Sequence, residues 1–149
     1  MMYLFSSELG QIHYAWDGCC CTRLMLQQEP GAQDETLLLP HADPVSEWLE
    51  HYFNGDMQAL PPLAPAATVF QQRMRVALLK IPVGEMRTYG EVAKALHTSP
   101  RAMGQALGAN PLPVMIPCHR VVAADGLGGF AFGSLWKQQL LSLEAAASM

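Results

Sequence analysis

Short runs of β-forming residues, separated by turns, make up the first part of the chain. The runs are 2–5, 11–16 and 22–26, with turn residues at 7–10 and 17–18 between them. Runs of this length, rich in aromatic and branched side chains, are typical of antiparallel strands. We therefore predict a small antiparallel sheet. After a polar loop over 27–35, the apolar run Leu37–Leu39 is expected to return to the sheet.

Helical spacing of apolar residues begins behind Asp43, which can cap a helix whose first residue is Pro44. The spacing continues until Asn54 and Gly55 end the pattern. Three prolines within 56–66 then indicate a linker. The pattern predicts two domains, an N-terminal one over residues 1–67 and a C-terminal one over residues 68–149.

Four helices are predicted in the C-terminal domain, three of them behind a residue that can cap a helix. The second and third are separated by the three residues 97–99, which predicts a helix-turn-helix with the third helix as its recognition helix. The fourth is expected to dock through Leu140 and Leu141. The first helix is expected to run from behind Thr68 to before Pro82, and the second from behind Thr88 to near Leu96. The third is expected to run from behind Ser99 to near Ala109, and the fourth from Trp136 to near Ala146.

The expected recognition helix, Arg101 to about Ala109, carries mostly small residues and one long cation at its start. Small residues let a helix approach another surface closely, and a positive helix N-terminus suits phosphate groups. A helix packed tightly in a core would have the same composition. An arginine at the head of a helix of small residues can enter a narrow groove of DNA without obstruction, so this composition is also compatible with contact with DNA.

Composition and cysteine usage narrow the class of protein. The 149 residues are 50% hydrophobic and 15% charged, as in an ordinary globular protein. No apolar run reaches about eighteen residues, and the N-terminus has no secretory signal pattern, so we expect a cytoplasmic protein. The four cysteines are expected to be reduced, because they have no metal-binding Cys-x-x-Cys spacing.

Three of the cysteines, Cys19 to Cys21, are consecutive. Zinc binding by these residues together with His13, His41 or His51 is one interpretation. Three adjacent cysteines on a strand cannot all converge on one ion, so we predict buried strand cysteines and no metal.

Charge is distributed unevenly along the chain, whose net charge is −4. Residues 1–67 hold one basic and nine acidic residues, whereas residues 68–149 hold eight basic and four acidic ones. A chance partition of surface charge would give the same numbers. The asymmetry nevertheless favours a basic working region joined to an acidic one, so the negative total does not exclude nucleic-acid binding.

The stretch from Pro113 to Val122 is apolar and strand-like, with Cys118 between a proline and a histidine. A cysteine in an apolar run is most often an inert buried residue. Here Pro117 restricts the backbone, and His119 and Arg120 would favour a thiolate if they faced the same pocket. Neighbours on a strand face opposite sides, so a bond between Cys118 and His119 would need a turn or a bridging water.

A series of short motifs runs from about Phe70 to Glu144. They are Gly84-Glu85, Tyr89-Gly90-Glu91-Val92, Arg101-Ala102-Met103-Gly104, Asn110-Pro111 and Pro117-Cys118-His119-Arg120-Val121. In this order they resemble the O6-alkylguanine-DNA alkyltransferases, repair proteins that move an alkyl group from guanine O6 to their own cysteine. Alkyltransferase-like proteins that only bind lesions carry another residue, typically tryptophan, in place of Cys118. A purely lesion-binding role is therefore disfavoured.

The resemblance implies an α/β (α+β) fold and a DNA partner. The N-terminal domain would be ribonuclease-H-like, with a small antiparallel sheet and a helix, and the helical C-terminal domain would contain a winged-helix-like helix-turn-helix. A monomer without a cofactor would act on double-stranded DNA containing O6-alkylguanine, or O4-alkylthymine, and accept one alkyl group. Arg101 would fill the space that the flipped nucleotide leaves. The residues expected to contact DNA are Thr88, Tyr89, Arg101, Ala102 and Gln105.

The resemblance also assigns catalytic roles. Cys118 would be the nucleophile, His119 its base through a water, and Glu144 the acid that orients the histidine. Tyr89 would stabilise the leaving guanine, and Lys137 matches an active-site lysine. Asn110 would form a hinge whose side chain holds the backbone of this turn to the reactive segment. By residue type alone, Glu144 and Lys137 would be solvated and Tyr89 half-buried, and Asn110 before a proline would be a routine turn former.

The expected substrate pocket departs from the family in one loop. Family members commonly have Gly-Tyr-Ser-Gly-Gly where this chain has Gly129-Phe130-Ala131-Phe132-Gly133. Ala131 lacks a hydroxyl that could bind the base, and Phe132 replaces a glycine, which disfavours bulky alkyl groups. The residues expected to form the pocket are Met115, Ile116, Pro117, Gly129, Phe130, Ala131 and Phe132.

Two other functions fit parts of the same pattern. A DNA-binding regulator would use the helix-turn-helix alone, with Cys118 as a redox or alkylation sensor. A Cys–His hydrolase would use the nucleophile and base but would not need a helix of small residues headed by arginine. Stoichiometric uptake of a methyl group distinguishes an alkyltransferase from both.

Overall fold

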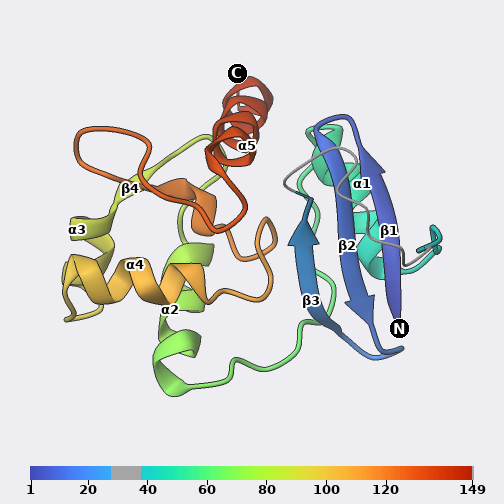
Figure 1. Ribbon diagram of the computed structural model, residues 1–149, viewed down its shortest axis with the longest axis horizontal. Coiled ribbons are helices and arrows are strands. Elements are labelled where there is room, and N and C mark those ends of the chain that lie inside the picture. Colours follow the sequence, from blue (N-terminus) through green and yellow to red (C-terminus); the bar gives the residue numbers. More distant parts are fainter. Residues whose placement is uncertain (28–37, 149) are drawn as a thin grey trace. The chain divides into compact units, whose positions relative to one another are not determined.

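The computed structural model describes residues 1–27 and 38–148. The chain divides into two compact units, Met1–Ala64 and Pro65–Met149, which are described separately (Figure 1). The predicted boundary at Ala67 lies three residues beyond this division. The predicted class, a mixed α/β fold with a small antiparallel sheet, is confirmed.

The first unit is a three-stranded sheet with one helix. Strands β1 (Met2–Ser7), β2 (Gly10–Trp16) and β3 (Cys21–Leu26) are antiparallel in this order. The helix α1 (Pro44–Phe53) begins as predicted, because the Asp43 carboxylate accepts hydrogen bonds from the first-turn amides and proline occupies the first position. Its apolar face packs on the sheet, and the rings of Phe5 and Phe53 stack at 6.0 Å.

The expected fourth strand is wrong where the structure describes it. Leu38 and Leu39 are not in a strand, although the Leu39 carbonyl accepts one hydrogen bond from the Leu4 amide at 3.0 Å. One hydrogen bond is too few to form a ladder. Leu37 and residues 28–35 of the polar loop lie outside the described residues.

The three consecutive cysteines differ in their surroundings. Cys21 is buried in β3, as predicted, and its thiol donates a hydrogen bond to the Arg23 carbonyl. Cys19 is exposed and Cys20 half-buried, so the prediction of buried strand cysteines is wrong for these two. They belong to the turn between β2 and β3, where the Asp17 carboxylate accepts hydrogen bonds from both of their amides. Within 1–27 and 38–148, no three His, Cys, Asp or Glu side chains gather to hold a metal ion.

The second unit contains every helix predicted for it. The capping residues act as expected: the hydroxyls of Thr68, Thr88 and Ser99 each accept a hydrogen bond from an amide in the first turn. None of the helices in the described part of the chain is long and apolar enough to cross a membrane. The elements are α2 (Val69–Leu79), β4 (Arg87–Thr88), α3 (Tyr89–Ala95), α4 (Pro100–Gly108), the 3-10 helix η1 (Cys118–Arg120), β5 (Val121–Val122) and α5 (Ser134–Ala147).

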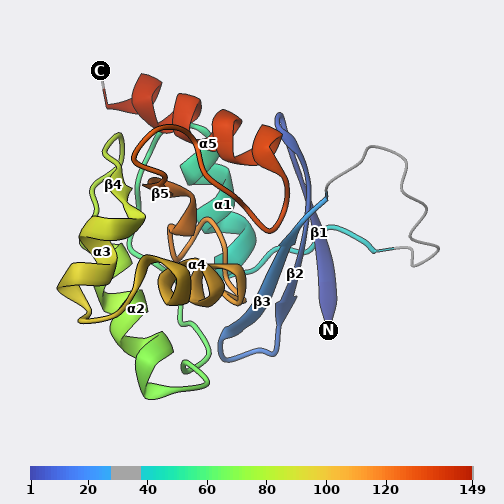
Figure 2. The same cartoon turned by 60° about the vertical axis from the view of Figure 1, so that its left-hand side comes forward.

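Helices α2, α3 and α4 lie next to one another, as both views show (Figures 1 and 2). The turn between α3 and α4 is short because His97 adopts a positive φ of 56° directly after the helix ends. Met74, Leu78 and Val92 are buried among these helices with Met103 and Leu107. The last helix, α5, docks through Trp136 and Leu140, whereas Leu141 is only half-buried.

The reactive stretch is not a strand, contrary to the prediction. Residues 113–115 form a turn in which Val114 has a positive φ of 73°, and Cys118 begins η1. Only Val121 and Val122 are extended, and they pair in parallel with β4. Prolines at 111, 113 and 117 lack the N–H donors that a central strand needs, so the apolar run cannot extend into a sheet.

Candidate active site

Cys118 is buried beside a pocket of about 390 Å³ in the second unit. A pocket of this size is within the range that holds small ligands. Its walls come from the start of α3, from one face of α4 and from the loop before α5. The lining residues are Tyr89, Gly104, Leu107, Gly108, Asn110, Cys118, Gly129, Phe130, Ala131 and Phe132.

The resting thiol of Cys118 holds its proton near neutral pH. Burial raises the pKa of Cys118 to about 11, and a hydrogen bond from Asn110 and the charge of Lys137 oppose this rise only in part. A thiolate therefore forms only when a base takes the proton.

The His119 ring, next to Cys118 in sequence, is held by Glu144. His119 Nε2 lies 2.6 Å from Glu144 Oε2, and both side chains are buried. Burial alone would raise the pKa of Glu144, but hydrogen bonds from His119 and Arg120 outweigh it and lower the pKa to about 2. The carboxylate thus accepts the Nε2–H, which leaves Nδ1 as the nitrogen that can receive a proton.

The other ring nitrogen, His119 Nδ1, is buried and has no hydrogen-bond partner among the described residues. Burial lowers the pKa of His119, against the opposing effect of Glu144, so the resting imidazole is neutral. In the described part of the chain, no direct hydrogen bond joins the Cys118 thiol to the His119 ring. Proton transfer between them therefore needs a bridging water.

Arg120 does not line the pocket, so the condition under which its charge would favour the thiolate there is not met. Its Nε and Nη2 donate to the two oxygens of Glu144 at 2.7 and 3.0 Å. Its Nη1 donates to the Ile81 carbonyl just beyond α2 at 2.7 Å. This bidentate pair fixes the carboxylate that holds His119.

Lys137 is fully buried, not solvated. Its Nζ donates to the Gly129 carbonyl at 2.8 Å and to Tyr89 Oη at 3.4 Å. Tyr89 in turn donates to the same carbonyl at 3.2 Å. Burial lowers the pKa of Lys137 to about 8. The lysine and the phenol therefore form a pair of proton donors at the pocket.

Gly128 makes this arrangement possible. It has a φ of +76°, and a Cβ added there would lie 2.7 Å from Tyr89 Oη. Any other residue would strain the backbone and displace the phenol. Gly128 was not among the predicted site residues.

Asn110 ties the reactive turn together. Its Nδ2 donates to the Ile116 carbonyl at 2.9 Å, and its Oδ1 accepts from the Leu112 amide at 3.0 Å. Both bonds are buried, so the side chain supplies partners that the turn's backbone would otherwise lack. This is the geometry expected of a hinge residue.

The residues expected to contact DNA lie on α4 and at the start of α3, and of these Tyr89 lines the pocket. Arg101 and Gln105 are exposed on α4, and Ala102 is half-buried between them. Gly104, Leu107 and Gly108 of the same helix line the pocket. Thr88 and Tyr89 are half-buried at the start of α3. One helix therefore carries both the exposed cation and part of the pocket wall.

A family model described as "6-O-methylguanine DNA methyltransferase, DNA binding domain" matches residues 69–146, more than half of the chain. The chain belongs to this family. The match extends from the start of α2 to the end of α5, so it includes the whole pocket and the hydrogen bonds around His119.

Named relatives of this family match between about two thirds of the chain and nearly all of it. The methylated-DNA–protein-cysteine methyltransferase of Haemophilus influenzae is 38% identical, over 94% of this chain and 83% of its own. The protein of the same name from Archaeoglobus fulgidus is 45% identical, over 64% and 70%. Among solved structures, Mycobacterium tuberculosis OGT in complex with DNA is 34% identical, with a TM-score of 0.82 over 98% of this chain and 93% of that one.

The structure changes the expected pocket in two ways. Met115, Ile116 and Pro117 do not line it; they are buried in the core, because the chain turns here and does not run as a strand. Gly104, Leu107 and Gly108 line it instead and were missed. Their spacing of three and four residues on one helix was a signal in the sequence that this face is open to a ligand.

Proposed function

We propose that this methyltransferase-family protein repairs O6-alkylguanine in double-stranded DNA by moving the alkyl group to Cys118. The observation that carries the proposal is the position of Cys118 on a small pocket, next to a histidine whose other face is held by a buried carboxylate. The membership of the family and the DNA complex of the M. tuberculosis relative support it.

The reaction begins with proton transfer from Cys118 through a water to His119 Nδ1. Glu144 stabilises the imidazolium that forms, in the manner of a catalytic triad. The thiolate then attacks the alkyl carbon in line with the bond to O6. The new S–C bond forms as the O6–C bond breaks, and its electron pair goes to the guanine.

The departing guanine needs a proton, and the pocket has two groups that can supply it. Tyr89 and Lys137 share the Gly129 carbonyl and are 3.4 Å apart. With its pKa at about 8, Lys137 readily replaces a proton that the phenol gives up. Tyr89 therefore acts as the donor to the base, and Lys137 keeps the phenol protonated.

The lesion reaches the pocket only after its nucleotide rotates out of the duplex, at a cost of a few kcal/mol. The helix α4 enters a groove of the DNA, and Arg101 at its head fills the space that the base leaves. Ala102 and Gln105 contact the DNA beside it. Thr88 and Tyr89, at the start of α3, face the sugar–phosphate backbone of the DNA.

The protein acts once. The product is a thioether, which no group in the pocket can hydrolyse, so one molecule repairs one base. A cytoplasmic location with reduced thiols belongs to the same proposal, and the four cysteines are free.

The test is mass spectrometry of the intact protein after incubation with a duplex containing O6-methylguanine. We expect a gain of one methylene mass per molecule, located on Cys118 by peptide mapping. Cys118→Ser should bind the duplex and gain nothing. Many turnovers of released product would instead identify a hydrolase, and binding without any mass gain would identify a regulator.

A further inference from the structure

A second depression on the unit Pro65–Met149 lies between α2 and α3. Its volume is about 610 Å³, larger than that of the Cys118 pocket, and the two share no lining residue. We refer to it as the α2–α3 groove. It is lined by Gln72, Arg73, Val76, Ala77, Lys80, Ile81, Arg87, Glu91, Val92, Ala95 and Leu96.

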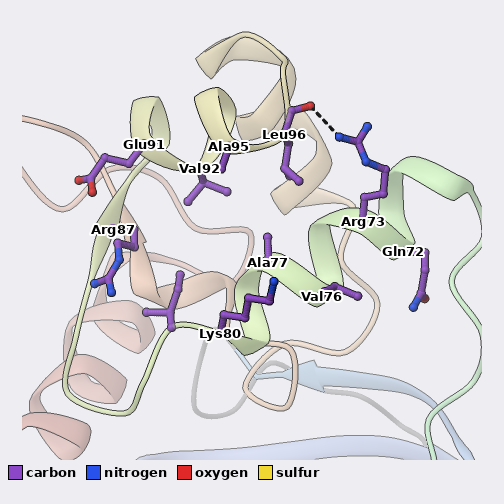
Figure 3. A pocket seen from close by; sticks show the side chains of 11 residues that line it. Gln72, Arg73, Val76, Ala77, Lys80, Arg87, Glu91, Val92, Ala95 and Leu96 are labelled. Carbon is purple, nitrogen blue, oxygen red and sulfur yellow. Dashed lines mark hydrogen bonds between the residues drawn. The ribbon is translucent and has the colours of Figure 1, made fainter.

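The floor of the α2–α3 groove is apolar. Val76 and Ala77 of α2 lie across from Val92 and Leu96 of α3 (Figure 3). Val76, which lines the groove, is 46% exposed; Val69 and Leu79 lie on the same helix outside the groove and are 80% and 45% exposed. A helix with only one packed face usually carries polar residues on the other. Adjoining exposed apolar residues indicate a binding surface.

The rim of the α2–α3 groove is positively charged. Arg73, Lys80 and Arg87 lie around it, and of these Arg87 already donates to Glu85 Oε1 at 3.2 Å. Glu91 is the one carboxylate among the described residues that line the groove, and it accepts a hydrogen bond from the Thr88 amide in the cap of α3. Arg73 is held at the edge because it donates to the Leu96 carbonyl at 3.2 Å (Figure 3). A partner that covers the apolar floor must therefore bring negative charge to the rim.

We propose that the α2–α3 groove docks an acidic, amphipathic helix of a partner protein. Arg73 and Lys80 are seven residues apart on α2, or about 10.5 Å along the axis. Carboxylates two turns apart on a docked helix would face both cations, while apolar residues at three- and four-residue spacing cover the floor. The charge, the spacing and the apolar floor thus match one class of partner.

Nucleic acid fits the groove less well. None of the described residues that line it is aromatic, so nucleobases find no surface on which to stack. Phosphates alone would pair with the cations and leave the apolar floor exposed to water. The groove and the Cys118 pocket share no lining residue, so a helix docked in the groove would leave the pocket open.

The probe is a fluorescent, designed helical peptide of about 15 residues, with leucines at three- and four-residue spacing flanked by glutamates. The matched control has lysine in place of each glutamate. We expect the acidic peptide to bind the full chain saturably, by fluorescence anisotropy, and to shift backbone amide resonances of α2 and α3. The basic peptide should do neither.

Variants then locate the site. Lys80→Glu should lower the affinity for the acidic peptide about fivefold or more, since it turns an attraction into a repulsion. Ala77→Trp should weaken it by filling the floor. Lys94→Glu makes the same charge change on an exposed residue of α3 outside the groove, so its affinity for the acidic peptide should stay within about twofold of that of the wild type. Methyl uptake by each preparation verifies that it is folded.

Several results would overturn the proposal. They are equal binding of the acidic and basic peptides, amide shifts outside α2 and α3, equal losses in Lys80→Glu and Lys94→Glu, or no binding by protein that still takes up methyl. Displacement of the acidic peptide by a single-stranded oligonucleotide that shifts the same amides would assign the groove to nucleic acid instead.

Discussion

Replacing Phe132 with glycine should open the Cys118 pocket to bulky O6 substituents. Phe132 lines the pocket, and its ring packs edge-on against Phe130 with the centroids 5.8 Å apart. A benzyl group that leaves the ring in place overpacks the site, at about 1–3 kcal/mol. One that pushes the ring aside loses the contact between the two rings, about 0.5–1.5 kcal/mol, together with the burial of Phe132.

Either route should slow benzyl transfer relative to methyl transfer by roughly ten- to hundredfold. The assay is single-turnover transfer from two duplexes that differ only in carrying O6-methylguanine or O6-benzylguanine. Phe132→Gly should recover most of the benzyl rate and change the methyl rate little, because a methyl group does not reach the ring.

Phe132→Ala is the matched control, because it removes the ring without the backbone freedom that glycine adds to the loop. It should recover benzyl transfer nearly as well as glycine. If both variants speed methyl and benzyl transfer equally, or if neither speeds benzyl transfer, Phe132 does not set the substituent size and the reasoning is wrong.

Three further predictions follow from the same unit. Glu144→Gln should slow transfer at least about tenfold near neutral pH, because it removes the charge that stabilises protonated His119. The pKa of Glu144 is about 2, below its ordinary 4.5, so the free energy of unfolding of the wild type should fall as the pH falls from about 5 towards 2. Urea unfolding should show a smaller fall for the variant over the same range. Asn110→Ala should lower the free energy of unfolding by roughly 2–4 kcal/mol, since two buried backbone groups lose their partners. Arg101→Ala should weaken capture of lesions in a duplex more than it slows reaction with free O6-methylguanine; equal losses would contradict a role between the base pairs.

The sequence predicted best what depends on neighbouring residues. The helices of the second unit begin where Thr68, Thr88 and Ser99 place a hydroxyl next to unpaired first-turn amides. The capped start at Asp43 followed the same rule. Such caps act within three or four residues, so they can be recognised without a tertiary structure.

The prediction failed where a side-chain contact or a proline, and not the apolar pattern, decides the local structure. The run from Val114 to Ile116 has the composition of a strand, but the Asn110 side chain binds its backbone and folds it into a turn. The sequence left open whether Arg120 faces the pocket, because its partner, Glu144, is 24 residues away. Neither contact leaves a periodic pattern that could be detected in the sequence.

The two-residue pairing of β4 with β5 has a mechanical consequence. Arg87 pairs with Val121 and Thr88 with Val122, so the start of α3 is joined through backbone to the residues that follow Cys118, His119 and Arg120. The position of the thiol relative to the start of α3 is therefore set in part by these two pairs of residues, together with the hydrogen bonds of Asn110 and Arg120. One residue inserted between Arg120 and Val121 would move this register by about 3.3 Å. That is about the length of two carbon–carbon bonds, and enough to carry the sulfur beyond the reach of a methyl group held in line.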